Sequence, residues 1–344
     1  MNTYKKIIAA LAVSGMMLTA LGPVGATAWA TASADGSKKT EQKLSPAEKT
    51  IADLDAKLLQ TALKTMRQLA GKEIELASAT ESNGTWFMYP EGGVQSGQVV
   101  INEKTGKVTS ARAELPFQEL SATMQKQAMD ALKNIDPAKT FTLGKVQRSI
   151  SFFGTEDDGI IYTYVNGEDA NVQFANDKRT YASVVYDPGA VDVNLRQAAA
   201  RAVKDFCGRA FQAKQISHTQ GEGRDVWRFE SEATSKGSIS VTFGAKTGNV
   251  WSIFNSYAST PMDAEVNKQF LKNVKEKDAV SAAVSVSQKV FGIDMKDYAV
   301  KRDKELANVF NFTKQEFPSI EVELNKSKQV AMFRITPAKG SKMD

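Results

Sequence analysis

Val99-Val-Ile-Asn-Glu-Lys-Thr-Gly-Lys-Val108 is the first of four similarly worded stretches in this chain of 344 residues. The other three are Val172-Gln-Phe-Ala-Asn-Asp-Lys-Arg-Thr-Tyr181, Val241-Thr-Phe-Gly-Ala-Lys-Thr-Gly-Asn-Val250 and Ile320-Glu-Val-Glu-Leu-Asn-Lys-Ser-Lys-Gln-Val330. Each has alternating apolar residues followed by a short polar run, which is the pattern of a β-hairpin. They recur every 70 to 80 residues or so, a longer period than in most solenoids and one that suits an array of small domains.

An amphipathic helix and several extended segments precede each hairpin. Apolar residues recur at intervals of three and four from Ser45 to Gly71, and similar helices are expected over 117–134, over 192–211 and after Asp263. We therefore expect an α+β fold made of tandem repeats, each with one helix packed on a small antiparallel β-sheet. A unit of about 70 residues is only marginally stable alone, so neighbouring units should share an interface or continue a sheet.

These patterns divide the chain into segments. The expected boundaries are a signal peptide over 1–34, a flexible leader over 35–43, repeat units over 44–116, 117–190, 191–260 and 261–337, and a tail over 338–344. Within the first and third hairpins, Gly106 and Gly248 are expected to be structural turn residues, because a tight turn often requires the positive φ that glycine tolerates.

The first residues predict the compartment. Lys5 and Lys6 precede an apolar run over 7–21, and small residues with two Ala-x-Ala sites follow, which is the order of a secretory signal. The run is too short and too interrupted for a retained membrane anchor. We therefore expect a secreted, extracellular protein, either free or associated with the cell wall, with no contact with the membrane after cleavage.

The charge balance excludes one class of partner. The chain has 44 basic and 39 acidic residues, and removal of the signal leaves 42 basic residues against 39. This mild excess is compatible with anionic wall polymers but is far below the basic footprint of a nucleic-acid-binding protein.

The sequence offers few residues for chemistry. Cys207 is the only cysteine and His218 the only histidine, so neither a disulfide nor a usual zinc site can form within the chain. Cys207 is expected to be a small core residue and His218 a surface or partner-paired residue. The acid pairs Glu230/Glu232 and Glu321/Glu323 lie on the polar face of expected strands, but a glycosidase also needs a cleft and sugar-stacking aromatic residues around its two carboxylates. We therefore predict no catalytic, metal or cofactor site, and no enzyme.

Two short motifs carry a resemblance to a family. Lys104-Thr-Gly-Lys-Val108 and Lys246-Thr-Gly-Asn-Val250, each at the end of a helix-then-strands unit, resemble the PepSY domain, a module of metalloprotease propeptides and bacterial envelope proteins. The second and fourth hairpins lack the glycine and match by order and spacing. The resemblance implies cystatin-like or PepSY-like units that bind or inhibit, chiefly acting on peptidases.

Three functions remain open. The first is a secreted, non-catalytic binding protein, inhibitor-like or regulatory, which presents sheet edges or faces to an extracellular protein such as a secreted peptidase. The second is a structural protein associated with the cell wall, which binds anionic envelope polymers. The third is an unrecognised hydrolase.

Overall fold

The computed structural model describes residues 51–152 and 159–344. The expected signal peptide, the leader and the predicted helix start at Ser45 lie outside this part. The first group of elements comprises η2 (Ile51–Asp53), α2 (Ala56–Ala70), β1 (Leu76–Ser82), β2 (Thr85–Pro90), η3 (Gly93–Gln95), β3 (Gly97–Asn102) and β4 (Val108–Pro116). The second comprises η4 (Phe117–Glu119), α3 (Ala122–Ile135), β5 (Leu143–Ser151), β6 (Ile160–Gly167), β7 (Ala170–Ala175) and β8 (Lys178–Tyr186).

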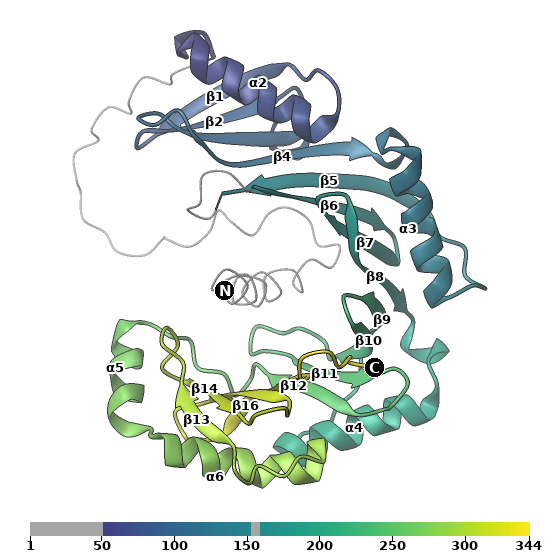
Figure 1. Ribbon diagram of the computed structural model, residues 1–344, viewed down its shortest axis with the longest axis vertical. Coiled ribbons are helices and arrows are strands. Elements are labelled where there is room, and N and C mark those ends of the chain that lie inside the picture. The colour runs from purple at the N-terminus through teal and green to yellow at the C-terminus, as the bar shows by residue number, and fades with distance from the viewer. Residues whose placement is uncertain (1–50, 153–158) are drawn as a thin grey trace. The chain divides into compact units, whose positions relative to one another are not determined.

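The remaining elements repeat the order of helix and then four strands. The third group comprises η5 (Pro188–Ala190), α4 (Val193–Cys207), β9 (Gln215–Gly221), β10 (Arg224–Glu230), β11 (Ile239–Gly244) and β12 (Val250–Asn255). The fourth comprises α5 (Ala264–Asn273), α6 (Glu276–Val286), the π-helical turn η6 (Ser287–Phe291), β13 (Ala299–Arg302), β14 (Val309–Thr313), β15 (Ser319–Leu324) and β16 (Val330–Thr336). Figure 1 shows these elements along the chain. No helix of the described residues is long and apolar enough to cross a membrane.

The strands form one antiparallel sheet, and the prediction of separate small sheets packed with helices in repeats is wrong. The strand order is β1 to β12 in sequence, followed by β16, β15, β14 and β13. At the first junction β4 pairs with β5 from Ser110↔Ser151 to Pro116↔Lys145. A separate four-stranded sheet would leave the backbone N–H and C=O groups of its two edge strands unpaired. Pairing of the edge strands of neighbouring sheets provides these backbone groups with hydrogen-bond partners.

The fourth group enters the sheet in reverse order, with β16 instead of β13 next to β12. The pairing runs from Ser252↔Arg334 to Phe254↔Met332. Strand β16 is buried along most of its length, whereas β13 is short, partly exposed and contains Lys301 and Arg302. An apolar strand is stable in the interior of a sheet and a short charged strand at its edge, which explains the reversal.

The helices extend over the junctions between groups. Helix α2 contacts β3 and β4 of its own group and also β5 of the next, and α3 contacts β7, β8 and β9. Helix α4 contacts β11 and β12, and α6 contacts β13, β15 and β16. Because α2 and α3 each bury part of the following group, the four-stranded groups are not independent packing units.

The core consists of two clusters of buried side chains. The first includes Trp86, Met66 and Phe174 and extends to β8, and the second begins at Val191 and includes Phe229 and Phe333. Tyr186, at the end of β8, packs against both clusters.

Each group ends in a hairpin with a β-bulge. The register shifts by one residue at Val100/Ile101, Gln173/Phe174, Thr242/Phe243 and Glu323/Leu324. Gly106 has φ +65° and Gly248 has φ +68°, and in both hairpins the glycine N–H donates to the carbonyl four residues earlier. In the shorter fourth hairpin Lys328 takes the positive φ, at +62°.

Side chains and glycines set the helix ends. Asp192 and Asp263 cap α4 and α5, near the helix starts that the sequence predicts, with their carboxylates accepting backbone N–H groups. Gly71 ends α2 at φ +75°, also as predicted. The start of α2 differs from the prediction, because Asp55 is its cap and η2 precedes it.

Candidate binding face of the sheet

Cross-strand pairing assigns every strand residue to one of two faces. On one face Val184 lies opposite His218, His218 opposite Trp227 and Trp227 opposite Phe243. This face carries the two apolar clusters and the helices. We call the other side the open face; on β5 to β8 it presents Gln147, Tyr164, Gln173 and Tyr181 opposite one another. Among the described residues, the two apolar clusters lie between the helices and the first face of the sheet.

Three tyrosines form the most distinctive feature of the open face. Tyr162 and Tyr164 are two residues apart on β6, and their rings stack with centroids 6.3 Å apart. Tyr181 on β8 lies across Gln173 from Tyr164. We call these three residues the tyrosine patch. All three are partly buried, so each presents part of a ring and a hydroxyl to solvent.

The tyrosine hydroxyls stay protonated over the physiological range. Burial raises the pKa of Tyr164 to about 12, with further contributions from Tyr181 and Tyr162. Burial also raises the pKa of Tyr162 and of Tyr181, and Glu222 in the β9–β10 turn adds to both shifts. A neutral phenol both donates and accepts hydrogen bonds. The patch therefore offers neutral hydrogen-bonding groups on rigid aromatic rings.

A close approach of two strands borders the patch. Gly221 on β9 has φ +141°, and a Cβ atom there would lie 2.1 Å from the carbonyl oxygen of Thr180. Next to it Thr219 Oγ1 donates to Ser183 Oγ at 2.9 Å, across the junction between the second and third groups. Glu222 and Gly223 form the two-residue turn of the β9–β10 hairpin that follows.

Two ion pairs lie on the open face. Arg228 contacts Glu230 at 2.7 Å on β10, and Arg334 contacts Glu321 at 2.6 Å across β16 and β15. Arg224 is on the same face of β10 as Arg228 and is exposed, and its charge acts on Tyr181 of the patch. The surface therefore carries charges of both signs, which suits a partner of mixed charge.

His218 lies on the helix-bearing face, in a small polar cluster. Its Nε2 is 2.7 Å from Asp225 Oδ1, and its ring stacks on Trp227 with centroids 4.5 Å apart. Gln220 Nε2 donates to the same carboxylate oxygen at 3.3 Å. The sequence did not indicate this aspartate, which orients the imidazole. The cluster lacks a hydroxyl or thiol nucleophile in contact with the imidazole, among the residues that the structure describes.

Hydrogen bonds or ion pairs within the protein hold Cys207, Glu230, Glu321 and Glu323. Cys207 is the last residue of α4 and is only partly buried, and its Sγ donates to Val203 O at 3.3 Å. Burial raises the pKa of this thiol, which disfavours the reactive thiolate. Glu230 and Glu321 are held by the arginines described above, and Glu323 accepts a hydrogen bond from Ser259 Oγ at 2.6 Å.

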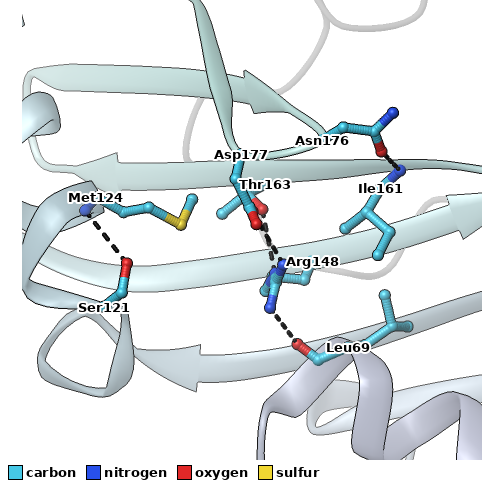
Figure 2. A network of polar contacts seen from close by, with 8 residues as sticks. All are labelled: Leu69, Ser121, Met124, Arg148, Ile161, Thr163, Asn176 and Asp177. Atoms are coloured by element: carbon cyan, nitrogen blue, oxygen red, sulfur yellow. Dashed lines mark hydrogen bonds and ion pairs between the residues drawn. The ribbon is translucent and has the colours of Figure 1, made fainter.

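Arg148 connects elements of the first two groups on the helix-bearing face (Figure 2). Its guanidinium donates to Leu69 O at the end of α2 at 3.0 Å, to Thr163 Oγ1 at 3.2 Å and to Asp177 Oδ1 at 3.1 Å. Thr163 is fully buried. Since the arginine makes all these contacts inside the protein, we assign it a structural role.

No cluster of metal ligands is present in residues 51–152 and 159–344, where no three His, Cys, Asp or Glu side chains are grouped to hold an ion.

The sequence patterns considered above did not predict the tyrosine patch. The i, i+2 spacing of Tyr162 and Tyr164 was an available signal, because residues two apart on a strand share a face.

The chain matches no protein-family model, no curated protein and no solved structure. The PepSY-like turns therefore remain a resemblance in sequence.

Proposed function

We propose that the chain is a secreted, non-catalytic binding protein that holds an exposed polypeptide segment of an extracellular partner, such as a peptidase, on the open face. The tyrosine patch is the observation that carries this proposal. Tyrosine supplies a large, rigid contact area at a low entropy cost, and it is enriched at the energetic centres of protein interfaces.

The residues around the patch suit the same role. Gln147, Gln173, Ser183 and Thr219 surround the tyrosines with short or amide side chains. Gln147 and Thr219 are partly exposed, so they can bond to a peptide backbone, as polar side chains do in antibody binding loops. The open face carries both acidic and basic side chains, which suits a polypeptide of mixed charge.

The test compares binding by matched variants of the mature protein. The immobilised chain is incubated with culture medium of its host, and the retained protein is purified and its Kd measured directly. We expect Tyr162→Ala/Tyr164→Ala to weaken binding by about thirtyfold or more, since truncation of a central interface tyrosine typically costs about 2 kcal/mol. Tyr89→Ala is the control, because this partly buried tyrosine lies on β2 of the same face and outside the patch.

The outcomes separate the proposal from its alternatives. Unchanged affinity in the double variant, with native melting behaviour, would show that the patch is not the binding site. Retention of wall polymer without protein would favour the wall-associated function. Turnover of a peptide, ester or glycoside by the purified chain would favour the hydrolase.

A further inference from the structure

A cavity of about 670 Å³ lies on the helix-bearing side of the third and fourth groups. The end of α4, the end of β12, α6 and the β15–β16 hairpin form its walls. Phe206, Val286 and Val330 contribute apolar surface, and polar side chains contribute the rest. Mixed apolar walls with a few polar groups are typical of small-molecule sites.

One wall residue is a buried amide without a partner. Asn255, the last residue of β12, is only 3% exposed, and its Oδ1 accepts no hydrogen bond from the described residues. Leaving such an acceptor unpaired is costly, so a native structure that keeps one requires an explanation. A ligand with an N–H or O–H group in the cavity would satisfy it.

The charged residues of the cavity wall are all basic. They are Arg209, Lys326 and Lys328, and none of the described aspartates or glutamates lines the cavity. Lys328 is held by Asp278, with Nζ 3.2 Å from Oδ1. The Arg209 guanidinium lies over the ring of Tyr257, 4.7 Å from its centroid. Such stacking leaves the edge N–H groups of a guanidinium able to bind an anion.

We propose that this cavity binds the carboxylate end of a short peptide. The carboxylate interacts with Arg209 and Lys326, and the preceding amide N–H donates to Asn255 Oδ1. Both requirements, a negative charge and a donor close to it, are met by a C-terminal peptide unit. The site is separate from the open face, so its test does not depend on the proposed function.

The experiment uses two probes that differ only at their ends. Equilibrium dialysis measures binding of radiolabelled acetyl-Gly-Gly, which has a free carboxylate, and of acetyl-Gly-Gly amide, which does not. We expect the carboxylate to bind with a Kd of about 1 mM or lower and at least tenfold more tightly than the amide. Inorganic phosphate is the third probe and tests whether charge alone is recognised.

Cys207 locates the binding. It is the only cysteine of the chain and lines the same cavity, so bound peptide should slow its alkylation by iodoacetamide. Lys326→Gln and Asn255→Asp should each weaken binding of acetyl-Gly-Gly at least tenfold, the second because it adds a negative charge. Lys304→Gln, at an exposed lysine outside the cavity, should leave binding unchanged.

Three results would overturn the proposal. The first is no binding of acetyl-Gly-Gly at millimolar concentration to the folded wild-type chain. The second is equal binding of carboxylate and amide, and the third is phosphate binding as tight as that of the peptide. Variants are compared only where their melting temperatures match that of the wild type, and Lys326→Gln is the variant least able to affect folding because Lys326 is exposed.

Discussion

Replacing Arg148 with methionine should destabilise the sheet by about 3 kcal/mol. The arginine side chain is only 14% exposed, and its removal leaves Leu69 O and the fully buried Thr163 Oγ1 without this donor. A buried group that loses its partner costs about 1 to 3 kcal/mol. A positive charge at the C-terminal end of α2 adds about 0.3 to 1 kcal/mol. The ion pair with Asp177 adds little, because that carboxylate is 61% exposed.

Urea unfolding followed by circular dichroism measures the loss, and two further variants separate its causes. Asp177→Asn should cost less than about 1 kcal/mol, since it removes only the exposed ion pair. Arg148→Met/Thr163→Val should be more stable than Arg148→Met alone, because an apolar pair leaves no hydroxyl unsatisfied. A cost below about 1 kcal/mol for Arg148→Met, or no rescue by Thr163→Val, would refute the reasoning.

Two other predictions concern turns and a buried acid. Gly106→Val and Gly248→Val should each destabilise by about 1 to 3 kcal/mol, the cost of a β-branched residue at positive φ. Space does not add to it, because a Cβ would lie at ordinary contact distance, 3.7 Å, from Leu58 Cδ2 at Gly106 and would meet no atom within 4 Å at Gly248. Gly144→Val, at an open strand position with no positive φ, should cost less, and equal melting temperatures would contradict this assignment. Burial raises the pKa of Glu323 above its ordinary 4.5, although Ser259 opposes the shift, so the folded state disfavours the carboxylate. The ionised Glu323 therefore destabilises the folded state fully at pH values above its folded pKa, and this destabilisation disappears as the pH falls towards 4.5. Glu323→Gln should thus raise the melting temperature at pH 7 and lose this advantage at pH 4. A stabilisation independent of pH would show that ionisation is not its cause.

Local signals in the sequence predicted local structure well. The helix stop at Gly71 and the helix starts near Asp192 and Asp263 follow from local patterns of a few residues. Long-range pairing was not predictable in the same way. No local pattern states that β12 pairs with β16, and only the comparison of an apolar β16 with a charged β13 explains it afterwards.

The sequence of β6 does not reveal which of its residues form the tyrosine patch. In β6, Ile161, Thr163 and Val165 alternate with Tyr162 and Tyr164, and both sets are suitable for burial. Periodicity therefore could not say which set faces the helices. Arg148 adds to the ambiguity, since a charged residue lies on the helix-bearing face between Val146 and Ile150.

The continuous sheet is the basis of the open face, and disulfide trapping at the three junctions tests it most directly. In a Cys207→Ala background, cysteine pairs replace Arg112/Ser149, Ser183/Thr219 and Ser252/Arg334, which lie opposite each other across β4–β5, β8–β9 and β12–β16. Directly opposed strand residues are within the Cα separation that a disulfide requires. We expect mild oxidation to form a disulfide in all three variants, detected by mass spectrometry, and not in a Ser252→Cys/Lys301→Cys control that would pair only if β13 adjoined β12. A junction pair that stays reduced in the folded protein, or a disulfide in the control, would contradict the single sixteen-stranded sheet.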